Sequence, residues 1–224
     1  MVGESIAQQR GPFARRLQEY AASIELTLSE QQVNQLLDYL ELFEKWNKAY
    51  NLSAIRDAEG MFTKHLLDSL SIAPHLTGER FIDVGTGGGL PGIPMAICFP
   101  QRHFTLLDSA GKKVRFLFQV KQALGLSNVD TQNRRVETFQ PQPQFDGVIS
   151  RAFASITYML TWCNHLIHDD GRFWAMKGVM PNSELSELPK KYIVKASHAL
   201  HVPNLEGERC LIELALAQES NSKA

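Results

Sequence analysis

The segment FIDVGTGGGLPGIP, residues 81–94, decides the fold. It follows an apolar run, and five of the eight residues from Gly85 to Gly92 are glycine. Glycine loses more conformational freedom on folding than other residues, so such a cluster indicates a backbone that turns tightly or approaches a ligand closely. FIDVG predicts a short buried strand, and PGIPMAICF (91–99) predicts a helix whose first turn tolerates its two prolines. The segment therefore predicts a strand, a glycine-rich turn and a helix.

Strand and helix patterns alternate around this segment. We expect strands over 81–85, 103–109, 128–133, 145–152 and 171–178, and helices over 91–99, 112–124 and 155–166. The early strands are nearly continuous apolar runs, which is typical of parallel strands covered on both faces. Two later strands, near 192–201 and 209–217, alternate more clearly and indicate an antiparallel edge. The fold class is α/β, with a mostly parallel sheet.

The chain before the glycine segment is helical. Apolar residues recur with helical period over 13–24, from Ser29 to Trp46, and over about 59–73. Ser29 is expected to cap the second helix, with Gln32 completing a capping box. We divide the chain into an N-terminal extension and helical section, 1–76, and a domain of residues 77–224. These helices can also pack directly on the sheet, which would make the chain one integrated domain.

Composition excludes several classes of protein. The 224 residues include 23 basic and 24 acidic side chains, so no bulk positive charge indicates nucleic acid. The three cysteines are far apart and indicate buried thiols in a reducing cytoplasm rather than a disulfide framework. No secretory signal or span of ~18 apolar residues is expected. His165 and His168 are three residues apart but lack an apparent third ligand, so no metal site is predicted.

The glycine segment fits two cofactor classes. Gly87, Gly89 and Gly92 satisfy G-x-G-x-x-G, the dinucleotide pattern of an NAD(P)-dependent oxidoreductase. Asp83 with Gly85, Gly87 and Gly89 satisfies D-x-G-x-G-x-G, which is typical of S-adenosylmethionine (SAM) sites. The dinucleotide register begins two residues beyond the end of the strand. An acid at 83 would repel a pyrophosphate but can face a cationic amino acid moiety, which favours SAM.

Asp108 closes the second expected strand, 25 positions after Asp83. A carboxylate at this edge can accept hydrogen bonds from both hydroxyls of a ribose. Both cofactor classes carry a ribose, so Asp108 does not separate them. An exposed acid at a strand end, without a ligand, is the alternative interpretation.

Several further segments carry a family resemblance. The chain resembles the RsmG (GidB) family of bacterial 16S ribosomal RNA (guanine-N7)-methyltransferases in NKAYNLSAIRD (47–57), KHLLDSL (64–70), FIDVGTGGGLPGIP (81–94), FTLLDSAGKKVRFL (104–117), RVE (135–137), DGVISRAFAS (146–155) and MKG (176–178). The resemblance runs from about residue 24 to 217 and assigns no role to the first 20 or so residues. It implies a Rossmann-like class I SAM-dependent methyltransferase fold preceded by helices. It also implies one SAM per chain and methylation of guanine 527, in the 530 loop of 16S rRNA.

The resemblance also implies site residues. Gly85, Gly87, Gly89 and Leu90 are expected to line the methionine and ribose end of the cofactor, in addition to Asp83. Asp108 is expected to bind the ribose hydroxyls, and Val136 and Glu137 are expected to contact the adenine. Arg151 is expected at the edge where the cofactor meets the substrate. One departure is Gly88, where the family usually has alanine or proline. We interpret this third consecutive glycine as permissive.

The expected chemistry requires little acid–base catalysis. Guanine N7 carries a free lone pair and no proton at neutral pH, so no general base is nominated. Arg151 or Lys177 is expected to position the base or a neighbouring phosphate. His65 and Asp68 share a helix face, and structural hydrogen bonding is favoured for them over a substrate role.

A local basic patch fits an RNA substrate. The patch consists of Lys112, Lys113, Arg115 and Lys121, and no acid interrupts residues 110–122. Arg134 and Arg135 are expected near the same ligand edge of the sheet, and Arg56 and Lys64 come from the helical section. Phosphate contact is the predicted role, and a solvated helix face is the alternative, above all for Lys121. We expect a monomer acting on 16S rRNA in the small ribosomal subunit or an assembly intermediate. A non-catalytic ribosome assembly factor that kept a SAM fold remains a further alternative.

Overall fold

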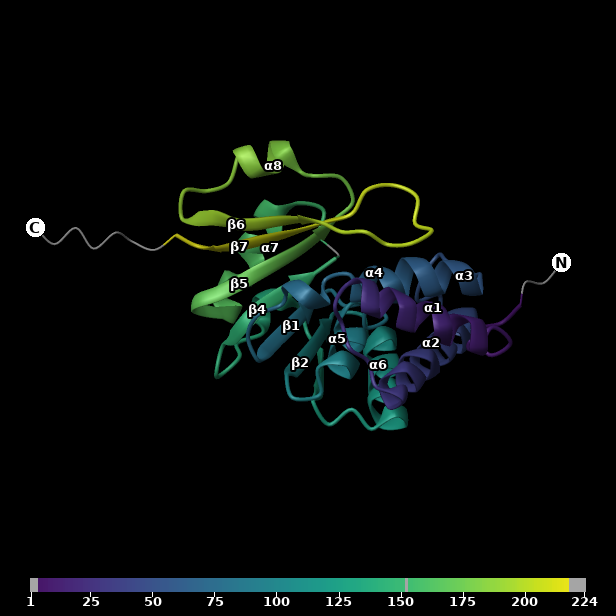
Figure 1. The fold of residues 1–224 in the computed structure, drawn as a ribbon. Helices are drawn as coiled ribbons and strands as arrows, with labels where there is room; N and C mark the ends of the chain where they lie inside the picture. The colour runs from purple at the N-terminus through teal and green to yellow at the C-terminus, as the bar shows by residue number, and fades with distance from the viewer. Residues whose placement is uncertain (1–3, 152, 218–224) are drawn as a thin grey trace, which may run out of the picture.

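The sheet has seven strands in the order β3-β2-β1-β4-β5-β7-β6 (Figure 1). The structure, a computed structural model, describes residues 4–151 and 153–217. The strands are β1 (Arg80–Val84), β2 (His103–Asp108), β3 (Val129–Asn133), β4 (Phe145–Ser150), β5 (Ile167–Lys177), β6 (Tyr192–Ala199) and β7 (Cys210–Leu216). Strands β1 to β5 pair in parallel, while β7 runs antiparallel between β5 and β6. The expected parallel sheet with an antiparallel edge is confirmed.

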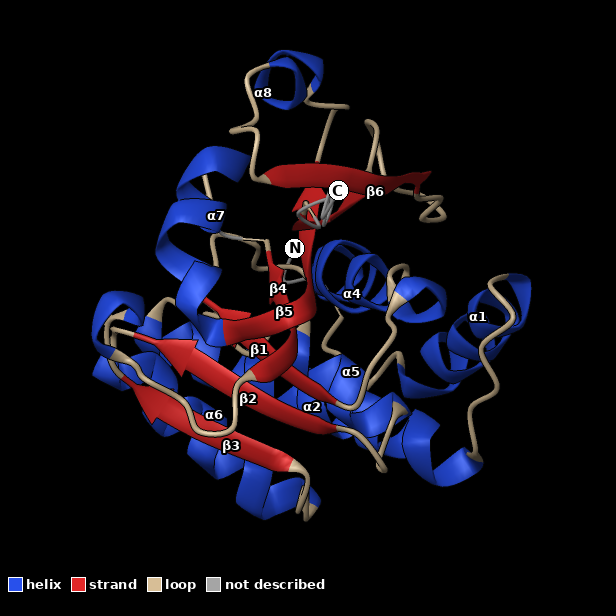
Figure 2. Cartoon of the chain, turned by 90° about the vertical axis from the view of Figure 1, so that its left-hand side faces the viewer, coloured by secondary structure: helices blue, strands red, loops and turns tan. Residues whose placement is uncertain are grey.

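Helices cover both faces of this sheet (Figure 2). Helices α5 (Gly92–Cys98) and α6 (Gly111–Leu124) lie on one face, and α7 (Ile156–Cys163) lies on the other. Successive side chains of a strand point to opposite faces. Accordingly, Phe81 belongs to the core beneath α5 and α6, whereas Ile82 and Val84 belong to the core beneath α7. Burial on both faces explains the unbroken apolar runs in the sequence.

The N-terminal section packs outside α5 and α6. It consists of α1 (Arg10–Ser23), α2 (Glu30–Tyr50), α3 (Ala58–Met61), the π-helix η1 (Phe62–Leu67), α4 (Asp68–Leu70) and the 3-10 helix η2 (Ala73–His75). Ser29 and Gln32 form the expected capping box at the start of α2. One hydrophobic core contains Phe13 and Phe43 from these helices together with Phe104 and Phe116 from the sheet domain. The division at residues 76 and 77 stays a prediction.

Three details differ from the sequence-based expectation. Strand β5 begins at Ile167, which pairs with Phe145, rather than at residue 171. The segment Asp169-Asp170-Gly171 has the composition of a turn, and in the structure it forms an irregularity inside β5. The register with β4 shifts there, between the pairs Phe145–Ile167 and Gly147–Arg172. The third helix contains a π-helical turn instead of being a continuous α-helix over 59–73. The short helix α8 (Asn182–Ser186), between β5 and β6, was not expected.

The remaining strand boundaries agree within two residues, whereas three helix ends differ by three or four: α1 begins at Arg10, α2 extends to Tyr50, and α7 ends at Cys163 before a 3-10 turn. Residue 152, at the end of the strand expected over 145–152, lies outside the described residues. His165 and His168 do not converge on a common ligand. The ring of His165 bonds to the Phe139 carbonyl, and that of His168 bonds to Asp146, each at 3.0 Å. Among the helices in the described ranges, none is long and apolar enough to cross a bilayer.

Candidate active site

The glycine loop between β1 and α5 is fixed from below by Asp83. Oδ2 of Asp83 accepts hydrogen bonds from the Thr86 hydroxyl at 2.7 Å and from the Gly92 amide at 2.8 Å. The amides of Gly85 and Thr86 donate to the carbonyl of Leu107 in the neighbouring strand. Left-handed backbone at Gly85, with φ of 71°, starts the turn that only glycine adopts without strain. The loop is therefore anchored to two strands and to the helix that follows.

Asp83 lies beneath the loop, with only 1% of its surface exposed. Burial raises the pKa of its carboxyl to about 6, although the hydrogen bonds from Thr86 and Gly92 act in the opposite direction. Its Oδ1 has no hydrogen-bond partner among the described atoms. The D-x-G-x-G-x-G pattern predicts that this carboxylate faces the cationic end of the cofactor. In the structure, the carboxylate of Asp83 fixes the loop through its hydrogen bonds with Thr86 and Gly92. Direct contact between Asp83 and the cofactor stays a prediction.

The glycines of the loop have two different environments. Gly85 and Gly87 line cavities at the carboxyl edge of the sheet. Gly89 and Gly92 are buried, and a Cβ at Gly92 would stand 2.2 Å from Cδ2 of Leu106. Gly92 thus serves helix–strand packing rather than the open side of the loop. Close helix–strand packing is also the role of the last glycine in the dinucleotide pattern, so the burial of Gly92 does not separate the two registers.

Gly88 is the contact between the loop and α2. The hydroxyl of Tyr39 donates a hydrogen bond of 2.7 Å to the Gly88 carbonyl. A Cβ at Gly88 would lie 2.3 Å from Cε2 of Phe43. The absence of a side chain is therefore required by the position of the Phe43 ring, and the interpretation of Gly88 as merely permissive is wrong.

A cavity of about 570 Å³ opens at the carboxyl ends of β1 and β2, beside the segments that follow β3 and β4. It brings together Gly85, Asp108, Val136 and Glu137, which the sequence predicted to bind one cofactor. Val136 is buried, while Glu137 is exposed at the rim. Parallel strands end at the same edge of a sheet, so residues up to 52 positions apart meet here. The cavity offers two carboxylates, those of Asp108 and Glu137, together with the buried Val136 and an exposed glycine backbone.

Asp108 is held in place by backbone amides. Its Oδ2 accepts from the Gly87 amide at 2.9 Å, and its Oδ1 accepts from the Ala110 amide at 2.8 Å. Nζ of Lys113 lies 3.5 Å from Oδ2. The residue is 6% exposed yet lines the cavity. Its position at the end of β2 is the one expected for a ribose ligand.

Two aromatic residues of α7 complete the wall of this cavity, and the sequence analysis missed them. Tyr158 and Trp162 line it and remain 58% and 44% exposed, with ring centroids 6.0 Å apart. Phe153 stands edge-on to Trp162, at 6.1 Å between centroids. The spacing of Tyr158 and Trp162, four residues apart on a helix, was the available signal, because such pairs share one face.

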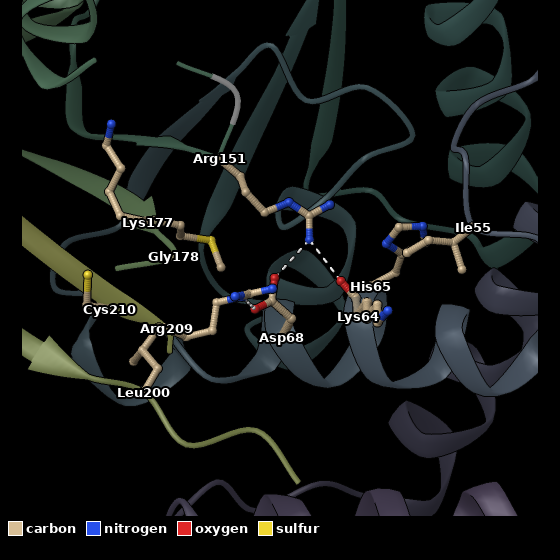
Figure 3. Close-up of a pocket in the computed structure, with 11 residues that line it drawn as sticks. Ile55, Lys64, His65, Asp68, Arg151, Lys177, Gly178, Leu200, Arg209 and Cys210 are labelled. Carbon is tan, nitrogen blue, oxygen red and sulfur yellow. Dashed lines mark hydrogen bonds and ion pairs between the residues drawn. The ribbon is translucent and has the colours of Figure 1, made fainter. Parts of the chain in front are cut away.

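Two further cavities continue the first. One, of about 210 Å³, is lined by Gly85, Gly87, Leu90 and Arg151 together with parts of α2, η1 and the segment between them. The other, of about 390 Å³, is lined by Arg151, Lys64, Asp68 and Arg209 (Figure 3). Gly85 belongs to the first and second cavities, and Arg151 belongs to the second and third. The three cavities therefore follow one another along the edge of the sheet.

Asp68 joins two arginines in the third cavity. Nη1 of Arg151 lies 3.0 Å from Oδ2 of Asp68 and 3.3 Å from the Lys64 carbonyl, while Nε of Arg209 lies 3.1 Å from Oδ1 of Asp68 (Figure 3). Asp68 is only 3% exposed, and a buried carboxylate is stable only when cations pair with it, as Arg151 and Arg209 do here. Arg209 lies 141 residues after Asp68 in the sequence, directly before β7, and no sequence motif indicated a role for it.

His65 has a structural partner of its own. Its Nε2 lies 2.8 Å from the hydroxyl of Ser53. Burial lowers the pKa of the imidazole to about 4, and the nearby charge of Arg151 acts in the same direction. The ring is therefore neutral at physiological pH. Structural hydrogen bonding was favoured for His65 and Asp68, and each does bond, although to different residues.

Lys177 lines the third cavity but its ammonium group is engaged elsewhere. Nζ lies 3.1 Å from the carboxylate of Glu184 in α8 and 3.2 Å from the Ala154 carbonyl. Figure 3 shows the side chain pointing away from Asp68 and Arg209. Of the two predicted positioning residues, Arg151 is the one directed into the cavities.

The structure brings together only part of the predicted RNA-binding cations, and Lys121, in the last turn of α6, lies at the opposite edge of the sheet, beside the start of β3. Lys113, Arg134 and Arg135 line the first cavity, Lys64 lines the third, Arg115 lines a separate cavity beside α6, and Lys112 is exposed at the start of α6. Arg56 is exposed, but its guanidinium donates to the Asn47 carbonyl and to the Asn51 side chain. Lys121 pairs with Asp130 at 3.4 Å. Phosphate contact by these residues stays a prediction.

Comparison with known proteins extends these observations. The family described as rRNA small subunit methyltransferase G matches residues 32–212. The ribosomal RNA small subunit methyltransferase G of Enterobacter sp. (strain 638) is 56% identical over 187 residues, which is 84% of this chain and 90% of that protein.

Solved structures share the fold at low sequence identity. The mitomycin 7-O-methyltransferase MmcR aligns with a TM-score of 0.58 at 14% identity, covering 84% of this chain and 68% of that one. TrmK of M. capricolum, solved with S-adenosyl-homocysteine, aligns with a TM-score of 0.52 at 14% identity, covering 67% and 68%. With the fold, the cofactor-sized cavity and this extensive identity in agreement, the chain belongs to the rRNA small subunit methyltransferase G family.

Proposed function

We propose that this chain transfers a methyl group from SAM to N7 of guanine 527, in the 530 loop of 16S rRNA. Membership of the family makes it an rRNA methyltransferase, and the target atom and position are the finer part of the proposal. The observation that carries it is the row of three cavities joined at Gly85 and Arg151. Such a row can seat a nucleoside cofactor at one end and a cationic substrate site at the other.

The first two cavities fit SAM. Asp108 would accept hydrogen bonds from the ribose hydroxyls, Val136 would pack on the adenine, and Gly85 and Gly87 would leave room for the methionine end. A Cβ at Gly87 would meet no atom within 4 Å, so open space lies above the loop there. When bound, SAM supplies a methyl group already activated on a sulfonium. The exposed Glu137 and Tyr158 complete the rim.

The proposed reaction requires no general base from the protein. Guanine N7 offers its lone pair directly, so the side chains must orient two reactants rather than remove a proton. His65 is neutral and bonded to Ser53, which suits a structural role. Correct orientation can supply on the order of 7–11 kcal/mol of the barrier. The guanine must also leave its base stack, which costs a few kcal/mol of stacking and pairing free energy and less when the base lies in an unpaired loop.

Arg151 is the residue we assign to orientation of the target. It lies between the second and third cavities, and Asp68 and the Lys64 carbonyl fix its guanidinium. A fixed guanidinium presents its donors in a rigid fork, which suits a guanine oxygen or a phosphate. Arg209 shares Asp68 and enlarges the cationic end of the row.

The setting of the reaction is also proposed. We place the protein in the cytoplasm as a monomer, acting on 16S rRNA within the small ribosomal subunit or an assembly intermediate. The near-neutral net charge of −1 supports a substrate presented by other ribosomal components, since long-range attraction to naked RNA is weak.

A methyl-transfer assay tests the proposal. Tritiated SAM is incubated with naked 16S rRNA and with 30S subunits, both lacking the modification. Incorporation into either RNA supports the enzyme, and the faster substrate identifies its natural form. Calorimetric binding of SAM without any transfer would instead favour an assembly factor, and binding of NADH without SAM would favour the oxidoreductase reading.

A further inference from the structure

The surface between α2 and α6 carries an aromatic group that the reaction does not use. It consists of Trp46 and Tyr50 on α2 and Phe118 on α6, here called the aromatic shelf. We propose that the aromatic shelf binds an unpaired base of the RNA substrate by stacking, outside the pocket for the methylated guanine. This inference rests on the proposed function for the identity of the RNA, and its own test measures RNA binding.

The shelf is built from exposed rings that are held in place. Tyr50 is 44% exposed and Phe118 is 49% exposed. The rings of Trp46 and Tyr50 stack with centroids 4.8 Å apart and planes at 28°. Beneath them, Trp46 contacts the buried ring of Phe116 at 5.5 Å between centroids. A contiguous group of exposed apolar rings, unlike a single exposed ring, indicates an interaction site, and these rings have a rigid support.

A cavity of about 380 Å³ lies against the shelf. Trp46 and Phe118 line it from two helices, and Val114, Arg115 and Asn133 contribute to its walls. It is mostly apolar, with one guanidinium at its side. A flat apolar site bordered by a cation is the combination that single-stranded nucleic acid binding uses, because every base has a π-face and every nucleotide a phosphate.

The charges around the shelf favour RNA over an apolar peptide. Lys112 and Arg115 are exposed on α6, and no acid occurs between residues 111 and 129. On the last turns of α2, Lys45 is exposed, and Lys48 pairs with Glu44 at 3.1 Å. Asp130, the acid of β3, forms ion pairs with Lys121 at 3.4 Å and with His103 at 3.2 Å. The cations left over on this surface match a phosphate backbone.

The shelf is also continuous with the candidate active site. Asn133 lines the shelf cavity and donates a hydrogen bond of 3.1 Å to the backbone carbonyl of Asp108. Arg134, the next residue, lines the cofactor-sized cavity. One RNA strand with its target base in the active site therefore passes close to the shelf with a neighbouring nucleotide.

Binding of RNA to alanine variants tests the shelf. The SAM-saturated protein is titrated with a fluorescein-labelled single-stranded RNA of about 12 nucleotides. We expect Tyr50→Ala and Phe118→Ala each to weaken binding by about 5- to 150-fold, the range given by the stacking of one base. Phe118→Trp and Tyr50→Phe keep a ring and should bind as the wild type. SAM affinity should be unchanged in all four.

Tryptophan emission gives a second readout. RNA should quench the emission of Trp46, so quenching should decrease in Trp46→Phe and persist in Trp162→Phe, whose ring lies in the cofactor-sized cavity. Ile193→Ala, at an apolar residue of β6 that is 40% exposed, and Lys195→Ala, at an exposed lysine of the same strand, are controls for surface change and for charge loss. Both controls should bind RNA like the wild type.

Two results would overturn the proposal. The first is wild-type RNA affinity in Tyr50→Ala and Phe118→Ala; if methylation of 30S subunits is lost at the same time, the shelf is a contact for a ribosomal protein. The second is quenching that persists in Trp46→Phe. Neither result depends on which RNA atom is methylated, so failure of the proposed function would be visible separately, in the product of the wild-type protein.

Discussion

The amide of Gly87 donates a hydrogen bond of 2.9 Å to Oδ2 of Asp108, which joins the glycine loop to the end of the neighbouring strand. The carboxylate that would hold the ribose therefore also holds the loop that would contact the methionine end. Its other oxygen accepts the Ala110 amide and so fixes the start of α6. One side chain thus aligns both parts of the proposed cofactor site.

Asp108→Ala should weaken SAM binding by about 10- to 150-fold. The substitution removes hydrogen bonds to a charged group, which contribute about 1.5–3 kcal/mol. Isothermal titration calorimetry with SAM measures the effect. Asp130→Ala removes an exposed acid from the next strand and is the matched control, expected to bind SAM normally. Equal SAM affinity in the two variants would contradict the assignment of Asp108.

Gly88→Ala should destabilise the protein by about 1–3 kcal/mol, the usual range for overpacking. The new Cβ would stand 2.3 Å from the Phe43 ring, so α2 or the loop must move. Urea denaturation measures the loss in the free energy of unfolding.

A double-mutant cycle makes the Gly88 test specific. Phe43→Leu removes the ring, so Gly88→Ala in that background should be much less destabilising than in the wild type. Additive effects of the two substitutions would show that the contact with Phe43 is not the reason for glycine at this position.

Arg151→Ala should lower the methylation rate at saturating substrate by about 100-fold or more, because a small misplacement of the reactants has an effect of this size. Asp68 keeps Arg209 as its partner, so the fold should persist with a normal thermal transition. Arg151→Lys should recover only part of the rate, since an ammonium lacks the fixed fork. Near-normal turnover in Arg151→Ala would exclude the proposed role.

Asp83 should make the wild type less stable as the pH rises. Its folded pKa of about 6 lies above the usual value of about 3.9, so the folded state binds its proton more tightly than the unfolded state. The stability associated with this proton is complete below about pH 4 and is lost as the pH rises through 6. Between pH 5 and 8 the loss should be about 1–2 kcal/mol.

Asp83→Asn isolates this effect. Asparagine does not titrate, and its side-chain oxygen can accept from Thr86 and Gly92 as the carboxylate does. Relative to the wild type, the variant should gain about 1–2 kcal/mol in the free energy of unfolding between pH 5 and pH 8. Urea denaturation at both values measures the difference, and the same difference at both would refute the elevated pKa.

Much of the fold follows from periodicity and from glycine. Burial of β1 to β5 on both faces leaves continuous apolar runs, and the common carboxyl edge of parallel strands brings Gly85, Asp108 and Val136 together. These relationships could be predicted because local pattern and sheet geometry determine them. Ser29 and Gln32 were likewise predictable as a cap, because the capping box is local in sequence.

The remaining features depend on contacts across the fold. Arg209 reaches Asp68 over 141 residues through the antiparallel edge, and nothing local indicates that pairing. Gly88 is explained only by Phe43 of α2, which approaches the loop through tertiary packing. The burial of Asp83 beneath the loop depends on how Leu106 and Gly92 pack, whereas the motif alone predicted a carboxylate that faces the cationic end of the cofactor.

The most direct test of the central claim is the chemical identity of the product. Small subunits lacking the modification are incubated with the protein and SAM, and the RNA is digested to nucleosides and to short fragments for mass spectrometry. The account predicts one N7-methylguanosine, in the fragment that contains guanine 527. A methyl group on another atom or at another position, or intact SAM with unmodified RNA, would contradict it.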